Sequence, residues 1–556
     1  MKLDAISQAE TVGDFIARYL AEIGVTTVFG VISIHNMPIL DAIARQGRIR
    51  FVPARGEAGA MNMADAWARV AGRMGVVITS TGTAAGNAAG AQVEALTAGT
   101  PLLHITSTVD TEFMDRDRAP IHDVPRQHEM LRGISKTYLR MWSASGALGT
   151  LTAAVSAAIS APAGPVSLEI PVDVQRKLMP AVAPIFAPAP QRPDPSPASI
   201  EALADMIRKA RRPMIWLGGG ARGAEAEARE LVARGFAAVS STQGRGVVPE
   251  DESANLGAYN MSPEAQALYA RADFMLVVGS RLRGNETLNN TMALPRPLAQ
   301  IDAEPTQGGR NYPVDLFVHG DAARSLRRLL DLLPATLDTD PEFAFETAAA
   351  RAQSEGALRD RLGPYRDLAE AISERVAAGR RPWVRDVTIS NSTFGNRYIR
   401  IAEPRLGVHA LGGGIGQGVA MGVGAALAGE AKAIVLIGDG GTQLGIAEMI
   451  TAVEAGAPLV YVLMNDQAYG VIRNIQDAQY DSRHHYSALL TPDFAAHCAS
   501  IGLRHRKVSA VADFAAALDD ALASDVPELI EVDMIAIGPF AESFSGPPAG
   551  AAGNKV

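Results

Sequence analysis

The sequence predicts an α/β protein made of three doubly wound domains, each built on a parallel sheet. Short apolar runs recur along the chain, and each is followed by small or polar residues and then by an amphipathic segment with helical spacing. The 556 residues are enough for about three or four domains of ordinary size. A proline-rich connector near residue 190 separates the first domain from the rest.

The first domain is expected over residues 1–180. It opens with a capping-box candidate, Thr11 and Asp14, ahead of an apolar helical face that Gly24 ends. The alternation of strand and helix then continues to about residue 172. The expected strands are 25–30, 49–52, 75–80 and 101–106.

Two further domains are expected at 198–335 and 360–540, followed by a tail at 541–556. The middle domain shows strand patterns at 214–217, 274–278 and 298–301. In the third domain, the uncharged run from Leu406 to Gly429 has Gly-x-x-x-Gly spacings like those of some membrane helices. Because it is rich in Gly and Ala rather than Leu and Phe, we expect a buried helix.

The most informative motif is Gly438-Asp439-Gly440-Gly441-Thr442, which follows the apolar run 433–437. A helical pattern comes next, and Asn465-Asp466 then follows the apolar run 459–464. This is the pattern of a βαβ unit, whose two parallel strands end at the same edge of the sheet. Asp439 and Asn465 should therefore lie close together.

One carboxylate and one amide oxygen suit Mg²⁺, which completes its shell with phosphate oxygens and water. Glycine amides and the helix start near Thr442 add donors for phosphate. A Gly-Asp-Gly triplet alone is more often an ordinary turn, and the Asn-Asp pair after the next strand is what favours a diphosphate and magnesium site.

Composition narrows the function classes. With 47% hydrophobic and 20% charged residues, a net charge of −9 and no block of like charges, the chain is a globular protein without a nucleic-acid surface. The single Cys498 excludes an intrachain disulfide and a cysteine-built metal site. The polar start of the chain does not resemble a signal peptide, so we expect a cytoplasmic protein with no membrane contact.

On these motifs the chain resembles the thiamine diphosphate (ThDP) enzyme superfamily, in the branch that holds acetolactate synthase, benzoylformate decarboxylase, pyruvate decarboxylase, oxalyl-CoA decarboxylase and benzaldehyde lyase. The resemblance covers nearly the whole chain. It implies a pyrimidine-binding first domain, a Rossmann-like middle domain and a diphosphate-binding third domain, with the first and third similar in topology. It also implies that Asp439, the side chain of Asn465 and the backbone carbonyl of Gln467 ligate Mg²⁺.

The resemblance further implies a catalytic acid beside the aminopyrimidine ring of ThDP. The segment Arg55 to Ala60 resembles the family segment that carries this acid, so we assign the role to Glu57. Burial raises the pKa of a glutamate and lets it share a proton with the ring. The alternative is that Glu57 only occupies the first turn of a helix, where carboxylates are favoured.

Other residues that would bind the cofactor follow from the same resemblance. In the glycine-rich segment 412–416, Ile415 matches the wedge that bends the cofactor and Gly413 offers a carbonyl to the pyrimidine amine. An isoleucine in an apolar run is otherwise usually part of the core. The remaining candidates for cofactor binding are Gly438, Gly440, Gly441, Thr442, Tyr469, Asn391 and Ser392.

The substrate side is expected in the first domain. His35 lies where benzaldehyde lyase carries an active-site histidine and could shuttle protons, although a lone histidine after a strand is more often structural. His122 and His128 fall near the family segment that reaches the pocket, and the backbone of the loop 81–87 should line it. Ile472 and Gln476 are candidates for the opposite wall.

One motif points elsewhere. Gly218-x-Gly220-x-x-Gly223 follows a strand and matches a dinucleotide fingerprint, but the next strand, near 236–240, does not end in the acid that would bind ribose. We interpret the motif as a structural turn. The run 281–285 also differs from the Arg-Phe-Asp-Asp-Arg run of some acetolactate synthases, so FAD is not expected.

The sequence thus predicts a ThDP- and Mg²⁺-dependent enzyme that decarboxylates a 2-oxo acid and can also ligate a second carbonyl compound, as in acetolactate synthase. Alternatives are an acyloin lyase or carboligase resembling benzaldehyde lyase, a nicotinamide- or flavin-linked oxidoreductase, and an inactive relative that only binds cofactor. The resemblance implies active sites between subunits, with Glu57 from one chain and Asp439 and Asn465 from another. We therefore expect a homodimer at least, and favour a homotetramer.

Overall fold

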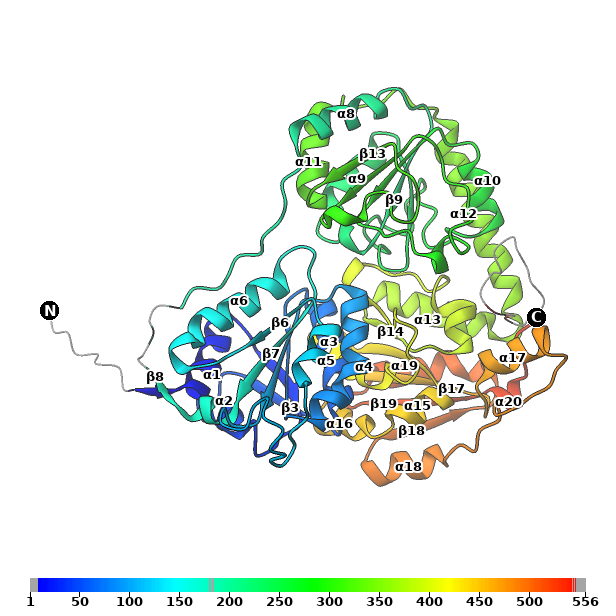
Figure 1. Ribbon diagram of the computed structural model, residues 1–556. Helices are drawn as coiled ribbons and strands as arrows, with labels where there is room; N and C mark the ends of the chain where they lie inside the picture. The colour runs from blue at the N-terminus through cyan, green and yellow to red at the C-terminus, as the bar shows by residue number, and fades with distance from the viewer. Residues whose placement is uncertain (1–8, 180–181, 183–184, 543, 545, 547–556) are drawn as a thin grey trace.

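The computed structural model contains three parallel sheets, each flanked by helices, and confirms the predicted fold class (Figure 1). The structure describes residues 9–179, 182, 185–542, 544 and 546. The expected tail at 541–556 lies almost entirely outside the described residues. Within the described part of the chain, no helix is both long and apolar enough to cross a bilayer.

The first sheet has six strands in the order β3-β2-β4-β5-β7-β6. The expected capping box is present, because the Thr11 hydroxyl accepts a hydrogen bond from the backbone of Asp14 and the Asp14 carboxylate accepts one from the backbone of Thr11. The strands are β2 (Thr27–Gly30), β3 (Arg50–Pro53), β4 (Gly75–Thr79), β5 (Leu102–Thr108), β6 (Thr137–Arg140) and β7 (Pro165–Pro171). The helices are α1 (Val12–Glu22), α2 (Met37–Gln46), α3 (Glu57–Ala71), α4 (Thr83–Ala98), α5 (Gln127–Gly133), α6 (Ala147–Ile159) and α7 (Val172–Arg176).

The third domain repeats this arrangement. Its six strands run in the order β15-β14-β16-β17-β19-β18, which is the strand order of the first sheet. The strands are β14 (Trp383–Arg385), β15 (Gly407–His409), β16 (Ala433–Gly438), β17 (Leu459–Asn465), β18 (Arg504–Val508) and β19 (Glu528–Asp533). The helices are α13 (Arg366–Ala378), α14 (Gly418–Ala428), α15 (Asp439–Gly445), α16 (Glu448–Glu454), α17 (Gly470–Gln479), α18 (Phe494–Ile501), α19 (Phe514–Ala523) and α20 (Met534–Ile537).

The middle domain carries a five-stranded parallel sheet in the order β10-β9-β11-β12-β13. Its strands are β9 (Pro213–Leu217), β10 (Ala237–Ser240), β11 (Phe274–Val278), β12 (Leu298–Asp302) and β13 (Leu316–His319). Its helices are α8 (Pro197–Ile207), α9 (Glu225–Ala233), α10 (Pro263–Tyr269), α11 (Ala322–Leu332) and α12 (Glu342–Arg361). A short antiparallel pair, β1 (Glu10–Thr11) with β8 (Leu178–Met179), closes the first domain near the connector.

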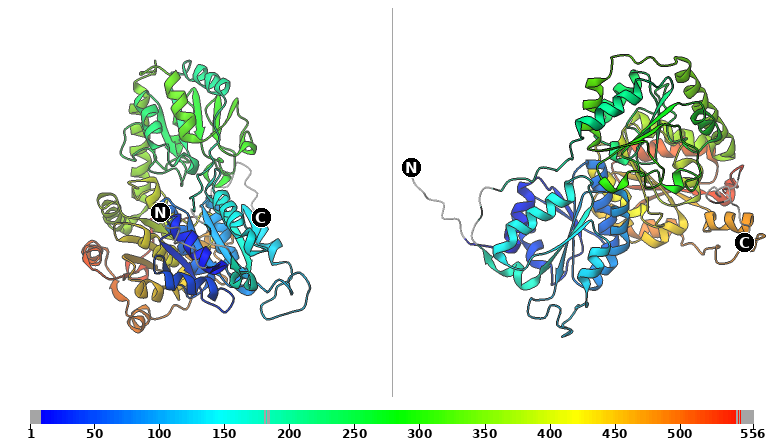
Figure 2. Two further views of the ribbon diagram at one scale, coloured as in Figure 1. Left: turned by 90° about the vertical axis from the view of Figure 1, so that its left-hand side faces the viewer. Right: turned by 45° about the horizontal axis from the view of Figure 1, so that its top comes forward.

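The first and third domains lie side by side, with the middle domain stacked on the pair (Figure 2). The uncharged segment expected to be a buried helix forms β15, a loop and α14, and α14 packs against α3. The helices approach so closely that a Cβ on Gly424 would lie 2.0 Å from the carbonyl oxygen of Met63. This contact joins the two domains whose loops carry the candidate site.

Both sheets of this pair reverse their winding direction at equivalent places, between β2 and β4 and between β14 and β16. Loops on either side of such a point leave the sheet in opposite directions and open a crevice beyond the carboxyl ends of the strands. Two candidate residues follow these strands: His35 comes after β2 and Asp439 after β16. Ser80 after β4 and Asp386 after β14 occupy the equivalent positions but were not candidates from the sequence. The strand order alone therefore predicts where in the two domains the site lies.

Candidate cofactor and active site

Asp439 and Asn465 lie at neighbouring strand ends, as the βαβ pattern predicts. β16 and β17 pair in parallel with Gly438 opposite Met464, so the residue after each of these positions emerges at the same edge. The Asn465 amide nitrogen donates to Glu531 at 2.9 Å. Because that bond fixes the amide, Oδ1 of Asn465 is the acceptor end. It takes the backbone N–H of Gln467 at 3.3 Å and keeps a second lone pair for a cation.

The Asp439 carboxylate is placed in a way that suits a divalent ion. Burial, together with the neighbouring Asp466 carboxylate, raises the pKa of Asp439. Its Oδ2 is buried and has no hydrogen-bond partner. In the described residues no three His, Cys, Asp or Glu side chains cluster as a metal cage. The donor set is one carboxylate and one amide, which fits Mg²⁺ completed by phosphate and water.

The Gln467 carbonyl, the third ligand implied by the resemblance, already has a partner. It accepts the backbone N–H of Leu489 at 2.9 Å, and Gln467 has a left-handed backbone with φ of 52°. Since a carbonyl oxygen has two lone pairs, one stays open. Its role as a metal ligand remains a prediction.

The glycines of the motif permit close packing around a possible diphosphate. A Cβ on Gly438 would lie 2.9 Å from Thr388 Oγ1, one on Gly440 2.7 Å from the Tyr469 ring, and one on Gly441 2.6 Å from Asp386 Oδ2. Tyr469 therefore lies against this turn, and its role in cofactor binding stays a prediction.

Three further polar atoms of the third domain are buried without a hydrogen-bond partner. They are Thr442 Oγ1, Asn391 Oδ1 and Ser390 Oγ. Buried polar groups are nearly always satisfied, so such a group calls for water, an ion or a ligand. Ser392, the other candidate, is only half-buried. Ser390 was not among the sequence candidates, because a single serine before a turn carries no spacing signal.

The glycine-rich segment 412–416 forms an irregular loop beside this turn. Gly413 and Gly416 adopt positive φ values of 79° and 86°, which glycine tolerates without strain. Ile415 is 39% exposed, so it is not the core residue that an apolar run would suggest. Its place on an open loop suits a side chain that contacts a ligand.

Glu57 is the first residue of α3 and its Oε2 accepts a hydrogen bond from Asn87 at 3.1 Å. The turn before it is held by the third domain: Glu448, a buried carboxylate on α16, accepts the backbone N–H groups of Arg55 and Gly56 at 3.1 Å each. A Cβ on Gly59 would lie 2.0 Å from Glu448 Oε1. Sequence reasoning missed Glu448 and gave Asn87 only a backbone role, because each side chain acts on a segment distant in the chain.

His35 and His122 come together, with ring centroids 5.1 Å apart. Burial, together with His122 and Arg176, lowers the pKa of His35, so its ring is neutral at pH 7. The segment 81–87, expected as a loop, is a short turn that leads into α4 at Thr83. Its Gly82 lies against the backbone of His122. Three loops at the carboxyl edge of the first sheet thus meet at this pair.

The other candidates on this side are more dispersed. His128 lies 3.9 Å from Asp115 and faces Tyr138, in a separate cavity of about 190 Å³ lined by Arg140 and Glu169. Ile472 is 48% exposed on α17. Gln476 donates to the carbonyl of His485 rather than facing the histidine pair.

Comparison with known proteins agrees with this geometry. Three family models described as thiamine pyrophosphate enzyme match the chain: the N-terminal binding domain at residues 10–130, the central domain at 200–329 and the C-terminal binding domain at 388–532. A probable 2-ketoarginine decarboxylase of Pseudomonas aeruginosa is 32% identical over 84% of this chain and 83% of its own length. The large subunit of acetolactate synthase isozyme 2 of Escherichia coli is 27% identical over 94% of this chain and 95% of its own.

The chain belongs to the thiamine pyrophosphate enzyme family. Its N-terminal binding domain contains Glu57, and its C-terminal binding domain contains Asp439 and Asn465. The family implies ThDP as cofactor, and the buried, unpartnered oxygens at the β16 edge fit its diphosphate and metal end.

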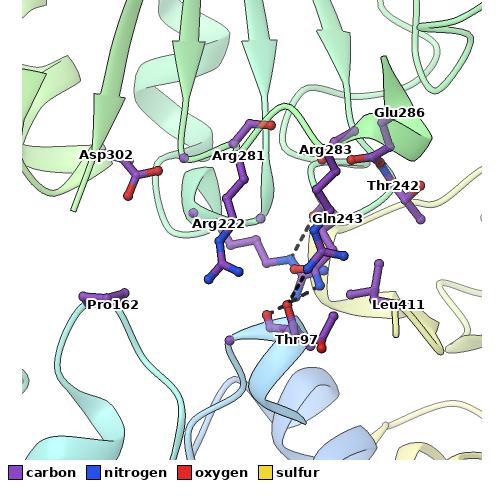
Figure 3. Close-up of a pocket in the computed structure, with 18 of the residues that line it drawn as sticks. Thr97, Pro162, Arg222, Thr242, Gln243, Arg281, Arg283, Glu286, Asp302 and Leu411 are labelled. Carbon is purple, nitrogen blue, oxygen red and sulfur yellow. Dashed lines mark hydrogen bonds between the residues drawn. The ribbon is translucent and has the colours of Figure 1, made fainter. Parts of the chain in front are cut away.

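In this thiamine pyrophosphate enzyme the glycine motif of the middle domain borders a cavity of about 430 Å³ (Figure 3). A Cβ on Gly218 would lie 2.2 Å from the carbonyl oxygen of Gly279, so the glycine permits two loops to pack, as expected for a structural turn. Arg222, Arg281 and Arg283 line the cavity, and Arg283 donates to the carbonyl of Thr97 at the end of α4. β10 leads into uncharged Ser241 and Thr242, so no acid follows this strand for a ribose.

Proposed function

We propose that the protein is a ThDP- and Mg²⁺-dependent decarboxylase of a 2-oxo acid. The observation that carries the proposal is the pair Asp439 and Asn465 at adjacent strand ends, with the Asp439 Oδ2 oxygen buried and unpartnered. The similarity to a probable 2-ketoarginine decarboxylase supports the reaction class. When bound, ThDP supplies the nucleophilic carbon and the electron sink that decarboxylation needs.

The protein's own residues would bind the metal and the cofactor and orient them. Asp439 and Asn465 would hold Mg²⁺, while Thr442, Asn391 and the glycine amides around Gly440 would hold the diphosphate. Gly413 would offer a carbonyl and Ile415 an apolar contact to the rest of the cofactor. Each of these residues follows the carboxyl end of a strand in the third sheet or lies in the loop before α14.

Side chains of the first domain would accept and donate the protons. Asn87 occupies Oε2 of Glu57, which leaves Oε1 as the oxygen that can hold and exchange a proton. His35 is neutral at pH 7, since its pKa is lowered, and can accept a proton in the substrate pocket. His122, its ring neighbour, is the second candidate for this role.

Biochemical reconstitution tests the proposal. Protein stripped with a chelator should bind ThDP by calorimetry only when Mg²⁺ is added back, and the holoenzyme should release CO₂ from a 2-oxo acid. The substrate panel should include short, branched, aromatic and guanidino 2-oxo acids, the last because of the 2-ketoarginine decarboxylase relative. Failure to take up ThDP in the presence of Mg²⁺ would contradict the proposal.

A second candidate function rests on His35, which resembles the active-site histidine of benzaldehyde lyase and lies 5.1 Å from the ring of His122. An acyloin lyase or carboligase would bind the same cofactor without losing CO₂. Aldehyde release from 2-hydroxy ketones, without CO₂ release from any 2-oxo acid of the panel, would favour this function over the first.

A further inference from the structure

We propose that two buried carboxylates, Glu94 and Asp386, are positioning residues that clamp the loop 411–417 at its two ends. This inference rests on the proposed function, because the loop carries Gly413 and Ile415. Glu94 comes from α4 in the first domain and Asp386 from the end of β14 in the third. Neither residue carries a motif or a role in the chemistry described above.

The loop needs such a clamp because packing does not fix its shape. Gly412, Gly413 and Ile415 are exposed, and residues 411–417 form no helix or strand. Glycine loses more backbone entropy on ordering than any other residue. A loop with four glycines between residues 412 and 416 therefore keeps one conformation only if hydrogen bonds hold it.

Glu94 holds the first end of the loop. Its side chain is 1% exposed, its Oε1 accepts the N–H of Leu411 at 2.8 Å, and its Oε2 accepts the N–H of Gly412 at 2.5 Å. Arg69 supports it by donating to Oε1 at 2.9 Å and to the carbonyl of His409 at 2.7 Å. Asp65 pairs with the same guanidinium.

Asp386 holds the other end. It is fully buried, and each of its carboxylate oxygens lies 3.1 Å from the backbone nitrogen of Gly416. The N–H groups of Gln417 and Gly418 also donate to it. The carboxylate also lies against the turn 438–442, because a Cβ on Gly441 would be 2.6 Å from its Oδ2. Asp386 thus fixes the loop relative to β16, the strand that leads into Asp439.

Replacing Glu94 by glutamine tests the first end of the clamp. The amide turns one acceptor into a donor that faces a backbone N–H, while Arg69 stays paired with Asp65, so the buried charges remain balanced. Hydrogen exchange measured by mass spectrometry on cofactor-free protein should become at least about tenfold faster in the peptide covering 411–416. The Kd for ThDP with Mg²⁺ present should rise about tenfold, and the KM for the 2-oxo acid should change less than about twofold.

Two further variants test the clamp independently of Glu94→Gln. Asp386→Asn should act in the same direction at the amides of Gly416 to Gly418. Gly412→Ala adds a methyl group 2.8 Å from Glu94 Oε2 in an exposed loop, so it should loosen the contact without disturbing the core. The matched control is Asp273→Asn in the middle domain, where a carboxylate also accepts two backbone N–H groups, at 2.8 Å each, and where neither readout should change.

The outcomes separate the two proposals. Folded Glu94→Gln and Asp386→Asn proteins whose loop exchange and ThDP affinity match the wild type would overturn the clamp. Wild-type protein that binds no ThDP would contradict the proposed function instead, and faster loop exchange in the variants would still support the clamp as a structural device.

Discussion

At the residue scale, Asp439 and Asp466 pair two buried carboxylates, an arrangement that costs stability unless a cation binds there. Their carboxylates are neighbours, and both pKa values are raised by burial. Asp439→Asn should therefore raise the free energy of unfolding of metal-free protein by about 1 kcal/mol. It should also abolish the increase in the free energy of unfolding that cofactor binding gives the wild type, which is expected to be about 2.7 kcal/mol at a ligand concentration 100 times Kd.

Urea unfolding in chelator, and again with ThDP and Mg²⁺, measures both effects. Asp466→Asn is the matched control, because it relieves the same repulsion but leaves the ligand in place, so its response to cofactor should persist. A cofactor response that survives in Asp439→Asn would show that the metal binds elsewhere.

Glu57 gives a second prediction at this scale. Glu57→Gln keeps the size and the hydrogen bond from Asn87 but cannot exchange a proton, so kcat should fall by about 10²- to 10⁴-fold. ThDP binding, measured by calorimetry, should stay within about threefold of wild type, since the carboxylate does not hold the diphosphate. A variant with normal kcat would remove Glu57 from the chemistry.

His104 links a buried side chain to pH. It is fully buried between Thr79 and Gln92, and burial lowers its pKa to about 3. In the unfolded chain the imidazole protonates below about pH 6.5, whereas in the folded state it stays neutral, so stability is present above that pH and is lost as pH falls toward 3. Between pH 7.5 and 5.5 the loss should be about 1.4 kcal/mol. The urea midpoints of His104→Gln should show a correspondingly smaller pH dependence than those of wild type.

Some site residues could be found from sequence and others could not, for a physical reason. Asp439 and Asn465 belong to one βαβ unit, so local spacing places them together. Glu448, Glu94 and Asp386 act on backbone groups of segments distant in the chain, and an isolated carboxylate has no pattern to reveal this. The resemblance predicts residues that would touch the cofactor, but none of those that hold its loops.

At the element scale, the contact between α3 and α14 joins the two binding domains. Gly424→Ala would place a methyl group against the carbonyl of Met63, and overpacking of this kind costs about 1–3 kcal/mol. Because α3 begins at Glu57, ThDP affinity should fall together with the unfolding midpoint. Gly356→Ala on α12, where a Cβ meets nothing within 4 Å, should leave affinity unchanged and add about 0.5–1 kcal/mol of stability.

Elements with strong periodicity were predictable, whereas short ones were not. The apolar runs became β4, β5, β16 and β17 within a residue or two, because buried parallel strands are continuous apolar sequences. β14 and β15 have three residues each and no pattern of their own. They form because β14 pairs with β15 on one side and with β16 on the other. This pairing depends on the tertiary fold and not on the local sequence.

At the scale of the whole molecule, exposed apolar side chains border the candidate site. Ile32 is 60% exposed beside the His35 loop, and Leu444 is 61% exposed beside the diphosphate turn. Exposed apolar side chains at a candidate site mark a surface that a partner covers. A second copy of this chain is the simplest such partner, since it would bring a first domain to each third domain.

Complementation tests that arrangement. Glu57→Gln and Asp439→Asn are each expected to be inactive, but a hybrid of the two would place both substitutions in one shared site and leave the other intact. Differently tagged chains produced together and purified as the hybrid should therefore show about half the activity of the wild-type dimer, following the symmetry of a twofold assembly. A chain carrying both substitutions, paired with itself, is the inactive control. A hybrid without activity would mean that Glu57 and Asp439 serve the same site from a single chain, and the exposed apolar residues would then need another partner.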